Sequence, residues 1–255
     1  LHHWEEPVIS GTRGSGAVFF SGCNLRCVFC QNHSISAEGV GKRITTARLR
    51  EIFEELIAQG AHNINLVTPT HFVPWILPAL EPPLPVPVVY NCGGYESLGT
   101  LRTLEGRVQI YLPDLKYLDP ALAARYSGAP DYPGVAKAAI LEMVRQVGAP
   151  QYDEEGIMRR GVLIRHLLLP GEMENTRRCL DFVAEHFRPG EVLVSLMSQY
   201  TPQPGAEGNL RRHVTRAEYR AAVAYMENCG ITDGYTQERT SAREEYTPAF
   251  DLRGI

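Results

Sequence analysis

Apolar runs of strand length alternate with amphipathic segments along this chain, and this alternation limits the folds that it can adopt. The predicted strands are residues 17–21, 63–68, 86–91, 108–114, 161–169 and 192–197. The predicted helices are residues 45–59, 72–80, 97–104, 133–147, 174–187 and 216–229. Repeated strand–helix units place their strands parallel in one sheet, with helices on its faces. Since a closed barrel of this kind needs eight units, six units predict an α/β fold with an open parallel sheet, a partial (βα)6 barrel.

The length of 255 residues suits a single domain, with residues 1–15 as a leader, 16–230 as the partial barrel and 231–255 as a tail packed across an edge. The formal net charge is -4, so charge gives no reason to expect a nucleic-acid partner. No apolar run approaches the roughly 20 residues that span a bilayer, and we see no secretory signal. We therefore expect a cytoplasmic protein with no membrane partner.

Half of the six cysteines stand in the stretch SGCNLRCVFCQN, residues 21–32. Cys23, Cys27 and Cys30 follow the first predicted strand directly, at the end where α/β barrels build their active sites. Three thiols are one too few for a closed tetrahedral zinc site, and an odd number does not suit a disulfide framework. Three thiolates can instead hold an iron–sulfur cluster and leave one iron open as a coordination site for substrate.

Three alternative roles of these cysteines stay open from the residues alone. His33 or Cys92 could complete a zinc site, although the paired C-x2-C arms of zinc fingers are absent. Cys92 could also be the fourth ligand of a cluster that only transfers electrons. Unligated core cysteines fit least well, because Asn24, Arg26 and Gln31 make the stretch too polar for a buried strand or helix.

The spacing C-x3-C-x2-C, with the aromatic Phe29 just before the last cysteine, resembles the signature of the radical S-adenosylmethionine (SAM) superfamily. The resemblance implies a 4Fe-4S cluster held by Cys23, Cys27 and Cys30, whose open iron is chelated by the amino and carboxylate groups of SAM. It also implies that one-electron reduction cleaves SAM to methionine and a 5'-deoxyadenosyl radical, which abstracts a hydrogen from the substrate. Phe29 would then stand where its backbone contacts the adenine.

The stretch VQIYLPDLKYL, residues 108–118, contains a predicted strand that ends at Asp114, with Lys116 just beyond it. Residues two apart on a strand share a face, so both side chains point the same way at the active-site end. A solvent-exposed ion pair of little energetic worth is the alternative. The stretch is similar to the pyruvate formate-lyase activating enzymes and their relatives, and this similarity implies that Asp114 and Lys116 contact SAM.

The stretch VLIRHLLLPGEMENT, residues 162–176, resembles the fifth strand of the same group. The resemblance implies that Arg165 faces the carboxylate or ribose of SAM, while His166 points to the opposite side. An arginine on an apolar strand needs a partner in any case, because burying it unpaired is costly. A structural ion pair with a neighbouring strand is therefore the alternative for Arg165.

Two further strand ends bear on SAM binding. The stretch VVYNCGGYES resembles a segment of the same relatives, which implies that Asn91 bonds the ribose or amino group of SAM, and a plain Gly-Gly turn is the alternative. The stretch NLVTPTHFVP departs from the G-G-E-like segment of that group, and Thr68 is our candidate to bind SAM there. We expect Thr70 to cap the following helix and His71 to be a first-turn helix residue rather than a catalytic group.

The last predicted strand runs into LVSLMSQYTPQPG, where the activating enzymes carry a histidine and this chain carries Ser198, Gln199 and Tyr200. Gln199 is our candidate SAM contact at this position. The overall resemblance implies that the hydrogen donor is a glycine of a partner glycyl-radical enzyme, and that a flavodoxin- or ferredoxin-type protein supplies the electron. The changed segments leave open a small molecule or free amino acid as substrate. Outside catalysis, the alternative is a non-catalytic iron–sulfur or zinc-binding protein.

Overall fold

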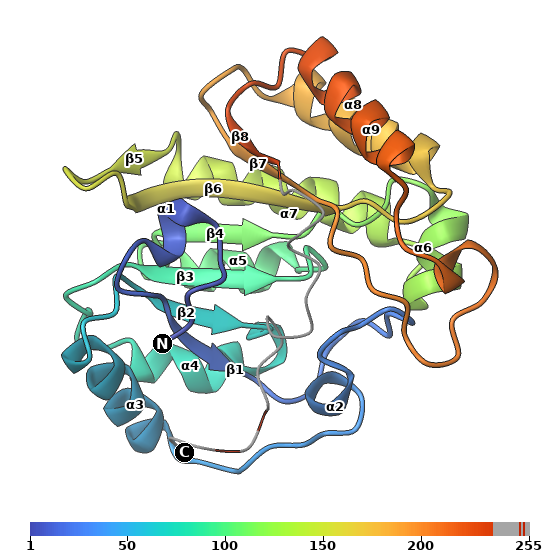
Figure 1. The fold of residues 1–255 in the computed structure, drawn as a ribbon. Helices are drawn as coiled ribbons and strands as arrows, with labels where there is room; N and C mark the ends of the chain where they lie inside the picture. Colours follow the sequence, from blue (N-terminus) through green and yellow to red (C-terminus); the bar gives the residue numbers. More distant parts are fainter. Residues whose placement is uncertain (237–249, 251, 253–255) are drawn as a thin grey trace.

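The computed structural model describes residues 1–236, 250 and 252, and it places the strands of this part of the chain in one sheet (Figure 1). The strand order is β1-β2-β3-β4-β6-β7-β8, with these strands parallel, while β5 pairs antiparallel with β6. The bounds are β1 Gly16–Phe19, β2 Ile64–Val67, β3 Val88–Cys92, β4 Ile110–Pro113, β5 Gln151–Tyr152, β6 Met158–Leu167, β7 Leu193–Met197 and β8 Gly234–Thr236. The prediction of an α/β fold with an open parallel sheet is confirmed.

Helices connect these strands, and several begin at side-chain caps. Their bounds are α1 Pro7–Ser10, α2 His33–Ser36, α3 Thr46–Ala58, α4 Val73–Ala79, α5 Leu98–Leu104, α6 Pro120–Ser127, α7 Tyr132–Val147, α8 Met173–His186 and α9 Arg216–Asn228, with 3-10 turns η1 Thr70–Phe72 and η2 Gly208–Arg211. Thr45, Ser97 and Thr215 each accept a hydrogen bond from a backbone N–H of the first turn. The six helices predicted from the sequence all form, each within one residue of its expected bounds.

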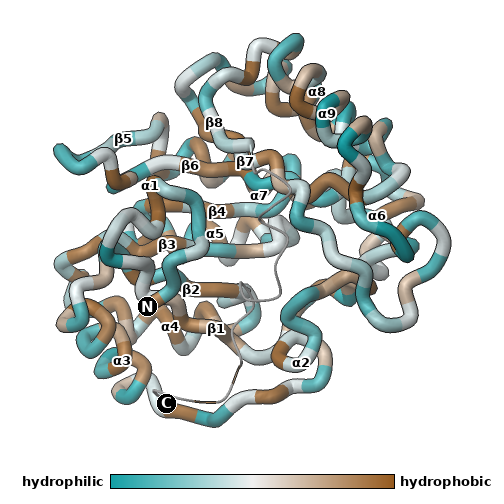
Figure 2. The backbone as a smooth tube through the Cα atoms, viewed as in Figure 1, coloured by the Kyte–Doolittle hydropathy of each residue, from teal (hydrophilic) through white to brown (hydrophobic). Residues whose placement is uncertain are grey.

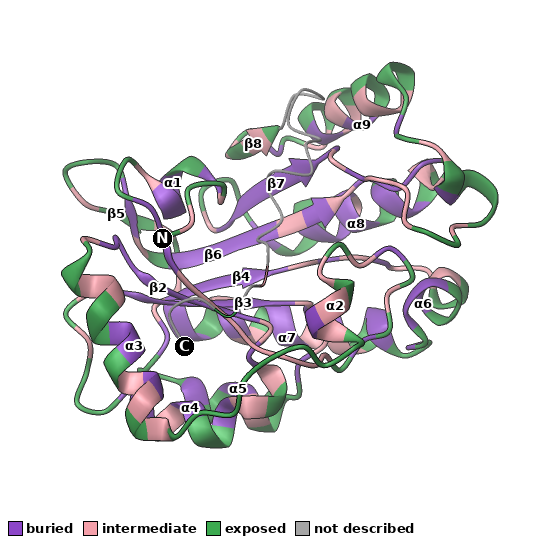
Figure 3. Ribbon diagram, turned by 60° about the horizontal axis from the view of Figure 1, so that its bottom comes forward, coloured by how far each residue is buried: buried purple, intermediate pink, exposed green. Residues whose placement is uncertain are grey.

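The outward face of the sheet carries the main apolar core. Alternate strand residues such as Leu66, Tyr90 and Ile164 pack there with helix residues such as Phe53 and Ile140. Figure 2 shows the hydrophobic stretches along the strands, and Figure 3 shows the strands mostly buried while the helices mix buried and exposed residues. Burial of this apolar surface stabilises the fold by about 25 cal/mol per Å² removed from water.

The inward face is closed at its base by the N-terminal leader, whose helix α1 lies in front of the strands in Figure 1. Val8 and Ile9 of α1 pack against Val89 and Leu163 on this face. The side chain of Asn63 fixes the leader, because its Nδ2 donates to the carbonyl of Ile9 at 2.7 Å. The leader therefore forms an apolar floor under the carboxyl ends of the strands.

The sheet is larger than predicted, because two short strands join it. The expected six parallel strands are extended by β8, which lies in the tail and pairs with β7 at one edge. Three residues are too few to show a periodicity, so only the pairing with β7 reveals this strand. The rest of the predicted tail, residues 237–249, 251 and 253–255, lies outside the described residues.

Among the described residues, none of the helices is long and apolar enough to cross a membrane. The longest of them, α7, has 16 residues, whereas a span needs roughly 20. The division into leader, barrel and tail and the cytoplasmic location stay predictions.

Candidate active site

The cysteine loop, residues 20–32, leaves the carboxyl end of β1 and lies against two short helices, α2 and α6, that the sequence analysis did not predict. The N–H of Gly22 donates to the carbonyl of Ile35 in α2 at 2.8 Å. The N–H of Val28 donates to the carbonyl of Tyr126 in α6 at 2.9 Å. Both halves of the loop are therefore tied to helices, which gives an irregular segment a defined path.

The three thiols of this loop are free and partly buried. Cys27 Sγ lies 3.0 Å from Ser127 Oγ, and Cys30 Sγ lies 3.2 Å from Ser36 Oγ. Cys23 Sγ accepts a hydrogen bond from the backbone N–H two residues further on, at 3.4 Å. Such hydroxyl and amide donors orient thiolate ligands and tune the metal that they bind.

The chemistry of these donors fits an iron–sulfur cluster. Within the part of the chain that the structure describes, no group of three or more His, Cys, Asp or Glu side chains is gathered tightly enough to hold one metal ion. A cluster makes a different demand, because each cysteine ligates a different iron and the thiols need not converge on one point. Burial raises the pKa of Cys23 and Cys27, while the positive charge of Lys116 acts on both in the opposite direction. That charge favours the thiolate, the form that binds metal.

Four of the predicted SAM contacts meet on the inward face, and we call Asn91, Asp114, Lys116 and Arg165 the polar cluster. Lys116 Nζ donates to Asp114 Oδ2 at 2.6 Å, and Arg165 Nε donates to Asp114 Oδ1 at 3.0 Å. Arg165 Nη2 donates to Asn91 Oδ1 at 2.6 Å. His166 points to the opposite side, where Nδ1 donates to a backbone carbonyl at 2.7 Å. The structure thus brings together side chains from the ends of β3 and β4 and from β6.

Opposite charges keep the three titratable members of the polar cluster, Asp114, Lys116 and Arg165, ionised. Burial by itself raises the pKa of Asp114, but the charges of Arg165 and Lys116 outweigh burial and hold that pKa below its usual value. Burial opposes the charge on Lys116 too, and the carboxylate of Asp114 nevertheless raises its pKa. The side chains of Lys116 and Asp114 are 17% and 20% exposed, so the alternative of a solvent-exposed pair is wrong. The alternative ion pair of Arg165 with a neighbouring strand is present, and its contact with SAM stays a prediction.

Two acidic residues of the leader, to which the sequence analysis assigned no role, enter the interior beside the polar cluster. Glu5 Oε1 accepts hydrogen bonds from Asn65 Nδ2 at 3.1 Å and from Asn91 Nδ2 at 3.2 Å. Glu5 Oε2 accepts from Arg165 Nη1 at 3.3 Å. The neighbouring Glu6 is buried, and burial raises its pKa. Two adjacent glutamates were visible in the sequence, but no periodicity places a leader inside a barrel.

The turn after β2 is held by polar contacts on both sides. Thr68 has a φ of 59°, in the left-handed region that favours glycine, and its N–H donates to the carbonyl of Asn91 at 2.8 Å. Thr70 does not cap the following helix, because it lies inside η1 and its Oγ1 donates to Glu96 Oε1 at 2.7 Å. His71 Nε2 donates to a carbonyl at the start of the cysteine loop, at 2.7 Å. The turn therefore links β3 to the cysteine loop, and the contact of Thr68 with SAM stays a prediction.

The end of β3 divides its side chains between the two faces. Cys92 is buried on the outward face, so it points away from the side that carries Asn91. Glu96 is buried there too, accepts a hydrogen bond from Tyr90 Oη at 3.0 Å, and has its pKa raised to about 7 by burial. Gly94 has a φ of 76°, and a Cβ atom at this position would collide with the backbone of Asp114, just after β4. The close approach at Gly94 is therefore to protein backbone, as a plain turn requires.

Comparisons with known proteins agree with this geometry. The family model of the radical SAM superfamily matches residues 17–81, which span β1, the cysteine loop and β2. An uncharacterised protein of Methanocaldococcus jannaschii is 30% identical over 243 residues, which are 91% of this chain and 66% of that protein. Over the segment that carries the cysteine loop, the chain therefore matches the radical SAM superfamily.

Solved structures share the fold of this chain. SuiB of Streptococcus suis, bound to S-adenosylmethionine, superposes with a TM-score of 0.59 at 16% identity, over 87% of this chain and 50% of that one. Methylornithine synthase superposes with a TM-score of 0.56 at 16% identity, over 83% of this chain and 62% of that one. The chain therefore spans less than two thirds of these solved chains, and likeness at such identities shows the fold alone.

Of the two remaining predicted contacts, Phe29 lies inside the cysteine loop and Gln199 lies beside it. The ring of Phe29 is buried edge-on against Tyr117 and Tyr200, with ring centroids 6.4 Å apart in each case. The backbone carbonyl of Gln199 accepts a hydrogen bond from Gln31 Nε2 at 3.4 Å. The structure therefore brings Gln199 next to the loop that contains Phe29, and the contacts of both residues with SAM stay predictions.

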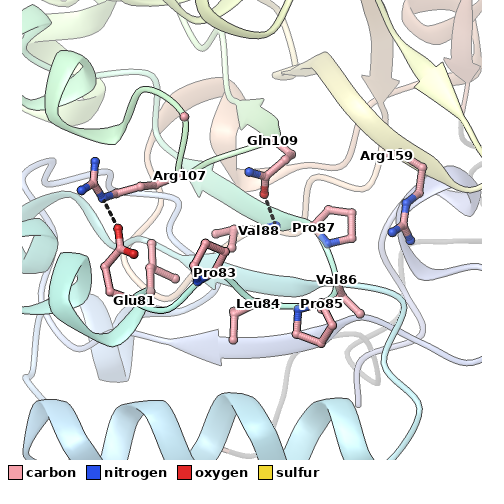
Figure 4. A pocket seen from close by; sticks show the side chains of 12 residues that line it. Glu81, Pro83, Leu84, Pro85, Val86, Pro87, Val88, Arg107, Gln109 and Arg159 are labelled. Carbon is pink, nitrogen blue, oxygen red and sulfur yellow. Dashed lines mark hydrogen bonds and ion pairs between the residues drawn. The ribbon is translucent and has the colours of Figure 1, made fainter.

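A cavity of about 270 Å³ lies at the amino ends of β3, β4 and β6, away from the cysteine loop (Figure 4). Its polar side chains already have partners: Arg107 Nε lies 3.1 Å from Glu81 Oε1, and Gln109 Oε1 accepts from the N–H of Val88 at 2.9 Å. The remaining lining is largely proline and aliphatic. This cavity is therefore separate from the candidate site.

Proposed function

We propose that this chain is a radical SAM enzyme in which Cys23, Cys27 and Cys30 hold a 4Fe-4S cluster and the polar cluster binds SAM. The observation that carries the proposal is the meeting of the cysteine loop and the polar cluster at one end of the sheet. Leu25 of the loop and Lys116 of the polar cluster lie beside the same residue, because a Cβ atom at Gly93 would lie 3.0 Å from Leu25 Cδ1 and 3.7 Å from Lys116 Cε. When bound, such a cluster supplies the electron that cleaves SAM to methionine and a 5'-deoxyadenosyl radical.

The polar cluster has donors left for a ligand. Arg165 carries five N–H groups, and its contacts with Asp114, Glu5 and Asn91 use one at each nitrogen. Two N–H groups of its guanidinium and two of the Lys116 ammonium are then available for a carboxylate or a hydroxyl, beyond the bond to Asp114. Because the acceptors already present fix the guanidinium plane, it can bind a carboxylate with little loss of side-chain freedom.

Anaerobic reconstitution with iron and sulfide tests this proposal. We expect about four irons per chain and, after addition of SAM and a strong reductant, release of 5'-deoxyadenosine. Iron content is measured by colorimetric analysis and the nucleoside by liquid chromatography with mass spectrometry. Tight zinc binding, or bound iron that never yields 5'-deoxyadenosine, would instead support the non-catalytic alternative.

For the substrate, we propose a glycine of a partner glycyl-radical enzyme, on the resemblance of the strand ends to the activating enzymes. Electron spin resonance on the reduced enzyme with SAM and candidate partners should then show a glycyl radical. A metabolite consumed without any such radical would favour the alternative of a small molecule or free amino acid. The activating enzymes carry a histidine in the segment where this chain has Tyr200. The hydroxyl of Tyr200 donates to the carbonyl of Leu210 at 2.6 Å, so it is not free to contact a substrate.

We further propose that a flavodoxin- or ferredoxin-type protein supplies the electron. The cysteine loop exposes Asn24, Arg26 and Val28, so a cluster held there lies close to the protein surface. An exposed arginine suits an acidic carrier, because complementary charge speeds association. Reduction of the reconstituted cluster by each carrier class, followed by its visible absorbance, tests this proposal.

A further inference from the structure

The carboxylate of Glu5 joins three strands of the barrel. Its oxygens accept hydrogen bonds from Asn65 on β2, Asn91 on β3 and Arg165 on β6, at 3.1, 3.2 and 3.3 Å. The Glu5 and Arg165 side chains are only 10% and 15% exposed, so water screens their ion pair weakly. A carboxylate in this position fixes the orientation of both Asn91 and Arg165.

Glu5 reaches these residues from the floor of the barrel. Asn65 on β2 pairs with Val89 on β3. Val89 lies two residues before Asn91, so its side chain also faces inward but lies nearer the amino end of the strand. The cysteine loop and Lys116 lie beyond the carboxyl ends of the strands. A ligand that enters beside the cysteine loop therefore meets Asn91 and Arg165 from the side opposite to Glu5.

The leader holds Glu5 in place at an energetic cost. Ser10 Oγ donates to the carbonyl of Glu5 at 3.0 Å, and Ile9 of the same short helix is fully buried. The adjacent Glu6 is buried with its Oε2 lacking a hydrogen-bond partner among the described residues. Burying an acidic pair in this way does not favour stability, which points to a role in the site.

We propose that Glu5 is a positioning residue of the SAM site, whose carboxylate holds Asn91 and Arg165 in the orientation that binds SAM. This inference rests on the proposed function. With Glu5 in place, the two cations Lys116 and Arg165 face two carboxylates, Asp114 and Glu5. Without Glu5, Asp114 would balance only one of the two cations. SAM carries a sulfonium charge, so a neutral site avoids the repulsion that one unbalanced cation would cause.

An inhibitory role for Glu5 predicts the opposite change in SAM affinity. If Glu5 instead competed with the carboxylate of SAM for Arg165, its removal would free the guanidinium and tighten SAM binding. A positioning role predicts weaker binding, because Arg165 and Asn91 lose the acceptor that fixes them. The direction of the change therefore decides between the two roles.

The substitution Glu5→Gln tests the inference on the full chain with its reconstituted cluster. Glutamine keeps the size of the side chain and one acceptor oxygen, but it places an amide NH2 where Arg165 Nη1 now donates. We expect unchanged iron content and a SAM dissociation constant raised about tenfold, measured anaerobically by equilibrium dialysis without turnover. Glu54→Gln, an exposed substitution on α3, is the matched control and should leave the dissociation constant unchanged.

Two results would overturn the inference: unchanged SAM affinity with iron retained, or tighter binding. If the loaded wild-type chain binds no SAM, the proposed function fails and this inference fails with it. If Glu5→Gln unfolds, Asn65→Ala carries the test, because it removes one anchor of the Glu5 carboxylate and leaves the polar cluster intact. We then expect about threefold weaker SAM binding, and unchanged affinity would count against the inference.

Discussion

The two faces of the same sheet are built for different purposes. On β6, Ile164 faces outward into the apolar core, while the next residue, Arg165, faces inward among charged and polar side chains. The outward face gains stability from its buried apolar side chains. The inward face becomes polar toward the carboxyl ends of the strands, where burial costs free energy unless each group is paired. The difference teaches that apolar packing accounts for the residues of the outward face, whereas the proposed binding of a ligand would account for the polar residues of the inward face.

The largest expected contrast lies between two cysteines. Cys27→Ala should abolish assembly of the cluster, because it removes one of the three proposed ligands on the cysteine loop. Cys179→Ala should leave iron content intact, because Cys179 is buried in the outward core. Iron and sulfide analysis of the two reconstituted variants measures this. Equal iron loss in both variants would contradict the separation of the two faces.

A smaller but still large effect is expected at Asp114 on the inward face. Asp114→Asn removes the charge that pairs both Lys116 and Arg165, and two partly buried cations then lie together. We expect the free energy of unfolding to fall by about 4 kcal/mol, measured by denaturant titration, and SAM binding to be lost. A stable variant that still binds SAM would show that the ion pairs do not organise the site.

Regular elements could be predicted from the sequence because their periodicity is local. The long helices α3 and α7 each bury one apolar face, and alternation along the strands placed Asp114 and Lys116 on one side. The cysteine motif likewise depends on spacing within a single loop. These features need only neighbouring residues to be recognised.

The parts that escaped prediction depend on contacts between distant segments. Helices α2 and α6 are short, and their importance comes from the serines that lie beside the thiols of Cys27 and Cys30. Glu5 acquires its partners only when the leader folds under the strands, across 60 residues to Asn65 and 160 to Arg165. No local pattern encodes such contacts, so the role of Glu5 in the leader could be recognised only in the folded chain.

The next largest expected effect is a change of stability with pH. It comes from Glu96, whose carboxyl group is buried on the outward side of β3. Burial raises the pKa of Glu96 from 4.5 to about 7 in the folded chain, whereas an unfolded chain ionises it near 4.5. Between these pH values the unfolded state binds fewer protons, so stability falls as pH rises and levels off above about 7. We expect the wild type to lose about 3 kcal/mol across this window relative to Glu96→Gln. Denaturant titrations at a series of pH values measure it, and parallel curves for both proteins would contradict it.

The smallest expected effect tests whether the outward face is independent of the site. Tyr111 lies on β4 with its ring in the outward core, and its hydroxyl donates to Gln146 Oε1 at 2.6 Å. Tyr111→Phe leaves that buried acceptor without its donor, so we expect the free energy of unfolding to fall by about 1 kcal/mol. The SAM dissociation constant should not change, because the side chain points away from the polar cluster, whose Asp114 follows the same strand. Weaker SAM binding in Tyr111→Phe, comparable to that of Asp114→Asn, would mean that the two faces are coupled through β4.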